Sequence, residues 1–175
     1  KKTQFWENEK WKKKHHRVQS QIYHHDLKPN IEAYEIWGGK LKRKIITNSL
    51  GFRDSAKKKI NKQTDKTRIL LIGDSFIEGS GYDYEYTLSG LLANKLGNRY
   101  EVLNSAVESY SPSIYFKKTE FYLSQGYDFD KALIFLDLSD IYDELFINFD
   151  KEENIISEVP KTKLTLERRI KNKIY

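Results

Sequence analysis

The chain has 175 residues, of which 38% are hydrophobic and 14% aromatic. This length suits one α/β domain with its own core and leaves little room for a second domain. The sequence contains no cysteine, which excludes disulfides and thiolate metal sites. It also lacks an apolar run of about 20 residues that would span a bilayer, and no signal-peptide pattern is visible. Because methionine is absent even at position 1, we expect the natural N-terminus and any targeting segment to lie outside this sequence.

Charge divides the chain unevenly. Residues 1–66 hold 18 basic and 7 acidic side chains, whereas residues 67–175 hold 13 and 18. The lysine runs at 12–14 and 57–59 are not interleaved with aromatic residues on one face, so no nucleic-acid partner is predicted. We interpret them as solvated surface, with attraction to an anionic membrane or polysaccharide as the alternative. This charge pattern is compatible with a location outside the cytoplasm and near a membrane.

Residues 1–66 form a basic lead-in that we expect to pack on the core. Its apolar spacing predicts a weakly amphipathic helix, then a hairpin of two short strands around a glycine pair, then an exposed linker. The helix corresponds to residues 1–20, the two strands to residues 31–37 and 44–47, and the linker to residues 57–66.

From Thr67 onward, short apolar runs alternate with helical stretches. Nearly all-apolar runs are typical of strands buried on both faces of a parallel sheet. Alternation of strand and helix implies right-handed crossovers and a mainly parallel, doubly wound, flavodoxin-like sheet in three α/β/α layers. The expected strands are 68–72, 100–103 and 131–136, and the expected helices are 88–96 and 111–124. A hairpin of 145–149 with 154–159 and a basic helix over 164–175 complete the predicted 67–175 domain, which we expect to be incomplete at its C-terminus.

Polar residues follow each predicted parallel strand. These are residues 73–76, 104–107 and 137–140. Ligands of open α/β sheets bind beyond the carboxyl ends of the strands. The three polar groups are therefore expected to meet at one rim of the sheet.

The tripeptide Gly73-Asp74-Ser75 is a weak signal alone, because aspartate and serine often cap helices. Its setting is more specific. It directly follows a predicted buried strand, and the glycine-rich stretch 78–81 comes after it. This context favours a functional site over a simple cap.

In this setting the sequence resembles the SGNH/GDSL hydrolases. Residues 72–76, Ile-Gly-Asp-Ser-Phe, match the family's first block, which carries a nucleophilic serine. Residues 102–107 are similar to the second block, although the family usually has glycine at position 106. Residues 138–140 stand where the third block has Gly-x-Asn-Asp. Stretches 27–30 and 48–53 also resemble the lead-in of some bacterial members, so the resemblance covers about residues 22–145.

The resemblance implies Ser75 as the nucleophile. It also implies an oxyanion hole made of the Ser75 and Ala106 amides with the Ser139 side chain in place of the family's asparagine. Removing one such donor typically costs about 10²–10³ in rate, so the serine is compatible with a slow enzyme. The supporting residues would be Gly73, Asp74, Asn104 and Asp140. No metal and no organic cofactor are implied.

The catalytic base is not evident. A serine hydroxyl needs a neighbouring base to become nucleophilic, and the family's Asp-x-x-His pair is missing, since no histidine follows His25. One expectation is that this pair lies beyond Tyr175. The alternatives are that His25 and Asp26, in the run His24-His25-Asp26, supply the base, or that catalysis has been lost.

Two other patterns are less specific. The glycines between 73 and 81 lack the lysine and spacing of a phosphate-binding loop. The carboxylates Asp137, Asp140, Asp143 and Glu144 would suit a metal, but without a nearby histidine we interpret them as a helix cap and solvated charges.

The predicted function is therefore a serine esterase that cleaves a small acyl ester, such as an O-acetyl group on a carbohydrate. An O-acetyltransferase with the same chemistry is equally compatible. The alternative class is a non-catalytic module that keeps the fold to bind a carbohydrate or a partner.

Overall fold

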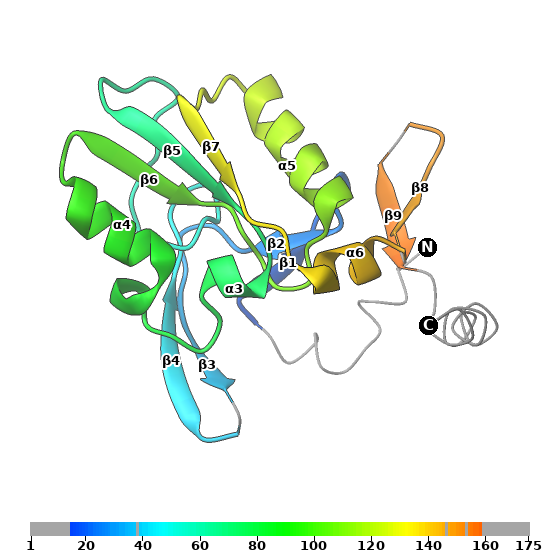
Figure 1. Ribbon diagram of the computed structural model, residues 1–175, viewed down its shortest axis with the longest axis horizontal. Helices are drawn as coiled ribbons and strands as arrows, with labels where there is room; N and C mark the ends of the chain where they lie inside the picture. Colours follow the sequence, from blue (N-terminus) through cyan, green and yellow to red (C-terminus); the bar gives the residue numbers. More distant parts are fainter. Residues whose placement is uncertain (1–14, 38, 146, 153, 159–175) are drawn as a thin grey trace.

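The centre of the protein is a three-stranded parallel sheet. The computed structural model describes residues 15–37, 39–145, 147–152 and 154–158. Within it, β5 (Thr67–Ile72) lies between β6 (Tyr100–Asn104) and β7 (Lys131–Ile134), in the order β6-β5-β7 (Figure 1). The protein therefore belongs to the α/β class, as its sequence predicts.

Alternate residues of β5 pack into two different apolar clusters. Ile69 and Leu71 pack with residues of α4 (Leu88–Leu96). Leu70 and Ile72 pack with residues of α5 (Pro112–Ser124). Successive side chains of a strand point to opposite faces, so each face of the central strand has its own helix. Both helices begin and end close to their predicted positions.

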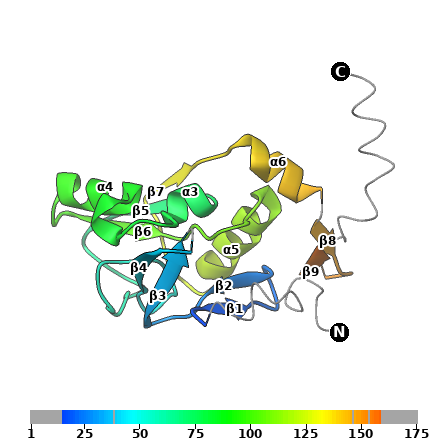
Figure 2. The same cartoon turned by 90° about the horizontal axis from the view of Figure 1, so that it is seen from below.

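The lead-in forms two antiparallel pairs. The first joins β1 (Arg17–Gln19) to β2 (His25–Leu27), and the second joins β3 (Glu32–Trp37) to β4 (Leu41–Ile46). The β1–β2 pair lies on the same side of the sheet as α5, whereas the β3–β4 hairpin projects away from the sheet (Figures 1 and 2). The predicted hairpin is confirmed, with a second strand that starts earlier than expected.

Short elements connect and follow the main ones. A one-turn helix, α3 (Ser75–Glu78), follows β5, and a 3-10 turn, η1 (Tyr84–Tyr86), precedes α4. Beyond β7 come α6 (Leu138–Glu144), β8 (Ile147–Phe149) and β9 (Ile155–Glu158). The last two strands pair antiparallel, which confirms the predicted C-terminal hairpin.

The burial predicted for residues 131–136 is wrong. All six residues are exposed, including Ile134 at 60% and Leu136 at 64%. The reason is position: among the described residues, β7 pairs with β5 along one side only. An apolar run predicts a strand, but the run does not tell whether the strand is central or at the edge.

Two other expectations need correction at the lead-in. Residues 17–19 of the predicted first helix are β-strand, while residues 1–14 lie outside the described residues. The predicted linker 57–66 has no regular structure and is mostly exposed, but Ile60 is buried in the α5 cluster and its N–H donates to Ser49 Oγ at 2.9 Å. The predicted basic helix 164–175 also lies outside the described residues.

No helix in the described part of the chain combines the length and the apolar character needed to cross a membrane.

A buried ion pair attaches the lead-in to α5. Lys118 Nζ lies 2.7 Å from Asp26 Oδ1 and also donates to the carbonyl of Ser105 at 2.9 Å. Burial lowers the pKa of Lys118, and Asp26 opposes that shift. The Tyr110 hydroxyl accepts a bond from Lys118 and donates to the carbonyl of His25 at 2.6 Å. One helix side chain therefore connects β2 to the loop after β6.

We predict that Lys118→Met destabilises the fold by about 3–5 kcal/mol, because it leaves the Asp26 carboxylate buried without its cation. The free energy of unfolding in urea measures this. The double variant with Asp26→Asn should recover part of the loss. As a control, Lys44→Met removes an exposed pair with Glu32 and should leave the midpoint almost unchanged. A Lys118→Met protein as stable as the wild type would contradict the prediction.

Candidate functional site

The carboxyl ends of the three parallel strands meet at one edge of the sheet. The N–H of Ser105, after β6, donates to the carbonyl of Leu71 at 3.0 Å, and the N–H of Phe135, after β7, donates to that of Ile72 at 2.9 Å. Helices α3 and α6 both begin at this edge (Figure 1). The polar groups that follow β5, β6 and β7 are thus neighbours, as the sequence predicts.

Ser75 is the first residue of α3 and is half-buried. Asp74 caps the helix: its Oδ1 accepts the N–H of Phe76 at 2.9 Å, and its Oδ2 accepts the Ser75 hydroxyl at 3.3 Å. A side chain at Gly73 would come within 2.5 Å of Ile77 Cγ1. The glycine therefore lets α3 fold back closely against the end of the strand.

Asn104 connects the second strand end to α3. Its Nδ2 donates to the carbonyl of Ile77 at 2.7 Å and to Ser89 Oγ at 3.1 Å. Its Oδ1 accepts the N–H of Ala106 at 3.2 Å. The amide expected to stabilise an oxyanion therefore already has an acceptor, although the bond is at the long end of the normal range.

The residues that follow the third parallel strand, β7, form a capping box at the start of α6. Both the N–H and the hydroxyl of Ser139 donate to Asp137 Oδ1 at 2.5 Å, and Asp140 Oδ2 accepts the N–H of Asp137 at 3.0 Å. The helix cap expected for these carboxylates is confirmed, but the expectation of a solvated charge is wrong for Asp140, which is buried. Ser139 is exposed, and its hydroxyl is bonded to the cap of its own helix.

Three carboxylates from two strand ends come together at the rim. One oxygen from each of Asp74, Asp137 and Asp140 lies within 4.8 Å of the others. Burial and the negative charge of Asp137 raise the pKa of Asp74. Burial and the negative charges of Asp74 and Asp137 raise the pKa of Asp140. The Ser139 hydrogen bonds lower the pKa of Asp137. The carboxylates considered for a metal site from the sequence included Asp137 and Asp140 but not Asp74, which follows a different strand and joins them through the pairing of β5 with β7.

Two arginines of the lead-in bind the C-terminal end of the short helix α3. Arg17 Nη2 lies 3.0 and 3.1 Å from the two carboxylate oxygens of Glu78, and 3.0 Å from Glu108 Oε2. Arg53 Nη1 donates to the carbonyls of Glu78 at 2.9 Å and Gly79 at 2.5 Å. Neither arginine is predicted from the sequence, because nothing in the residues around positions 17 and 53 indicates a partner about 60 or 25 positions away in the chain.

The histidine pair is buried and has its own partners. His25 Nε2 lies 2.8 Å from the carbonyl of Glu108, so this nitrogen carries the proton and donates. His25 Nδ1 lies 2.8 Å from His24 Nδ1, and with His25 neutral it accepts the His24 proton. Ser75 Oγ, in turn, is hydrogen-bonded to Asp74. The structure therefore does not join His25 or Asp26 to Ser75.

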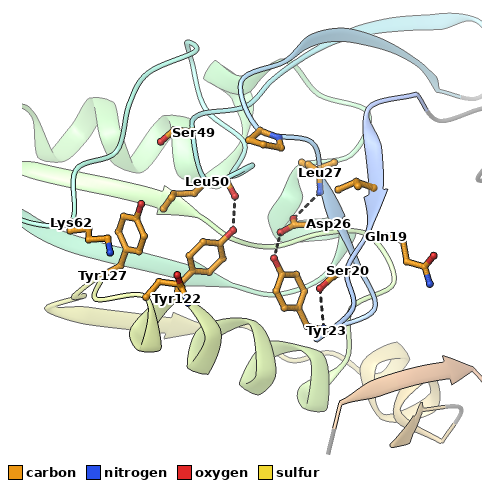
Figure 3. A pocket seen from close by; sticks show the side chains of 13 residues that line it. Gln19, Ser20, Tyr23, Asp26, Leu27, Ser49, Leu50, Lys62, Tyr122 and Tyr127 are labelled. Carbon is orange, nitrogen blue, oxygen red and sulfur yellow. Dashed lines mark hydrogen bonds between the residues drawn. The ribbon is translucent and has the colours of Figure 1, made fainter. Parts of the chain in front are cut away.

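A separate pocket of about 340 Å³ lies between β1, β2 and the end of α5 (Figure 3). Tyr23, Tyr122 and Tyr127 line it. Two of their hydroxyls are used within the protein: Tyr23 donates to Asp26 Oδ2 at 3.0 Å, and Tyr122 donates to the carbonyl of Leu50 at 2.6 Å. Ser75, Ala106 and Ser139 do not line this pocket, whereas Asp26, part of the alternative base predicted from the sequence, does.

Comparison with known proteins found no matching family model, curated protein or solved structure.

We predict that the protein loses stability as pH falls below about 6.5. Burial lowers the pKa of His24 to about 4 and that of His25 well below its usual value. Unfolded histidine takes up its proton near 6.5, so acid favours the unfolded chain. His24 alone should cost about 2 kcal/mol between pH 7 and pH 5. Urea unfolding at both pH values measures this.

The matched variant is His24→Asn, because asparagine tolerates the positive φ of 78° at this position and does not titrate. Its free energy of unfolding should fall by about 2 kcal/mol less than that of the wild type over the same interval. Equal pH dependence in both proteins would count against a neutral, buried His24.

Proposed function

We propose that the protein is a serine esterase of the SGNH/GDSL type that cleaves a small acyl ester, such as an O-acetyl group on a carbohydrate, through an acyl intermediate on Ser75. The observation that carries the proposal is the position of Ser75. It is the half-buried first residue of a short helix, directly after the central strand of a parallel sheet.

The surroundings of Ser75 support this role. Asp74 holds the turn through two hydrogen bonds, and Asn104 fixes α3 from the neighbouring strand. A nucleophile held on a rigid turn needs little reorganisation to attack. The buried Arg17–Glu78 pair adds to this rigidity at the C-terminal end of the helix.

In the proposed reaction, Ser75 Oγ attacks the acyl carbonyl carbon while a base takes its proton. The tetrahedral intermediate collapses, the C–O bond to the alcohol breaks, and the alcohol leaves with a proton. Water then attacks the acyl-enzyme, releases the carboxylic acid and restores the hydroxyl. In an O-acetyltransferase, a sugar hydroxyl would take the place of water.

The amides of Ser75 and Ala106 are the proposed oxyanion donors, with the Ser139 hydroxyl as the third. An oxyanion would have to replace Asn104 as the acceptor of the Ala106 N–H, and Asp137 as the acceptor of the Ser139 hydroxyl. Catalytic hydrogen bonds are often poorly aligned in apo enzymes and tighten only when substrate binds. We assign the base to an Asp-x-x-His pair beyond Tyr175, since His25 is enclosed among other partners.

The proposed function implies a more specific fold than the α/β class. We infer that the three parallel strands belong to a doubly wound, three-layer α/β/α sheet of the SGNH type. The packing of α4 and α5 against alternate residues of β5 supports this arrangement.

A non-catalytic binding module of the same fold is the second candidate. The specific observation in its favour is that both the Ala106 N–H and the Ser139 hydroxyl already have acceptors. The three carboxylates at the rim also oppose a negative charge that develops nearby.

The test is esterase activity toward p-nitrophenyl acetate, together with labelling by a fluorophosphonate. Both are measured on the protein as its source cell makes it, with any residues that flank this sequence. We expect covalent labelling at Ser75, and we expect Ser75→Ala to abolish labelling and to reduce kcat/KM by about 10³-fold or more.

The matched control is Ser80→Ala, because Ser80 lies in the same loop but its hydroxyl is buried. This variant should label and turn over like the wild type. A protein that neither hydrolyses the ester nor reacts at Ser75 would decide in favour of the binding module.

A further inference from the structure

The carboxylates of Asp74, Asp137 and Asp140 each use one oxygen to hold the fold. Asp74 Oδ1 caps α3, Asp137 Oδ1 caps α6, and Asp140 Oδ2 accepts the N–H of Asp137. The other oxygen of each carboxylate is left for a different partner. Asp74 Oδ2 accepts only the Ser75 hydroxyl, and Asp140 Oδ1 makes no hydrogen bond of normal geometry although the residue is 1% exposed.

The Tyr115 hydroxyl is a second buried group at this cluster. It interacts with the Asp140 carboxylate and acts electrostatically on all three carboxylates, but the Tyr115–Asp140 contact falls outside normal hydrogen-bond geometry. A buried oxygen without a well-formed hydrogen bond destabilises the folded protein. Such a group in a native protein often indicates a ligand or an ion.

In the part of the chain that the structure describes, no positive charge is paired with the three carboxylates. Among the described residues, no lysine, arginine or histidine forms an ion pair with any of them. The contrast with the rest of the interior is clear, because buried Glu78 is paired with Arg17 and buried Asp26 with Lys118. Buried charges are normally paired or bound to metal ions.

We propose that Asp74, Asp137 and Asp140 form a binding site for one hard divalent cation, Ca²⁺ or Mg²⁺, next to Ser75. The cation supplies the missing positive charge and a partner for Asp140 Oδ1. The cap hydrogen bonds hold the carboxylates in place, as outer partners do at metal sites.

The donor set defines the class of ion. All three ligands are carboxylate oxygens, which suit Ca²⁺, Mg²⁺ or Mn²⁺, whereas zinc and copper prefer histidine or cysteine. Oxygens on opposite sides of Ca²⁺ are about 4.6–5.2 Å apart, and around Mg²⁺ about 4.0–4.2 Å. The three oxygens lie within 4.8 Å of one another, which is compatible with their binding one such ion.

This site does not depend on the proposed esterase reaction. The cation binds through the aspartates, so Ser75→Ala should retain it even though that variant loses any activity. Loss of catalysis and loss of the cation are therefore separable.

The experiment is isothermal titration of the EDTA-treated 175-residue chain with CaCl₂ and with MgCl₂, combined with thermal unfolding in each. We expect saturable binding of one ion and a higher Tm. Asp137→Asn and Asp140→Asn should weaken binding at least about tenfold. Asparagine keeps the capping oxygen, so these variants should fold, and without cation they should be no less stable than the wild type.

Asp128→Asn is the control, because it removes the same charge from an exposed position outside the cluster. It should bind like the wild type. The proposal is overturned if the wild-type chain shows no saturable heat and no rise in Tm with either ion at about 10 mM, well above the range of most cellular sites, or if the two cluster variants bind as tightly as the wild type.

Discussion

The carboxylate of Glu78 is removed from water inside the protein and is paired there with Arg17. Its two oxygens lie 3.0 and 3.1 Å from one guanidinium nitrogen, and both side chains are fully buried. Breaking a buried pair of this kind leaves an uncompensated charge, which is strongly destabilising. Since Glu78 ends the helix that Ser75 begins, the orientation of the candidate nucleophile depends on a residue of the lead-in.

This contact changes how the basic lead-in is understood. Its net charge suggests a solvated surface, and Lys57, Lys58 and Lys59 are indeed exposed. Two of its arginines, however, are buried structural partners of the loop after β5. The same segment supplies Asp26, which pairs with Lys118 on α5. The lead-in is thus an integral part of the fold that positions the site.

At the rim, the aspartates combine two roles. Each holds a helix start or a turn with one oxygen, which makes the strand ends rigid. The same geometry gathers negative charge beside Ser75, which opposes an oxyanion unless a cation compensates it. The esterase proposal and the cation site are therefore related through electrostatics, although each is tested separately.

The sequence by itself determined the parallel strands predicted at 68–72 and 100–103, the helices predicted at 88–96 and 111–124, both hairpins and the polar residues at the strand ends. These depend on local composition: apolar runs, helix caps, and glycine or proline at element boundaries. Tertiary structure alone decided that β7 is an exposed edge, that His24 and His25 are enclosed, and that Asp74 meets Asp137 and Asp140. Each of these depends on which segments lie beside one another after folding. Neighbours distant in the chain set burial, partners and pKa, and a linear pattern does not contain that information.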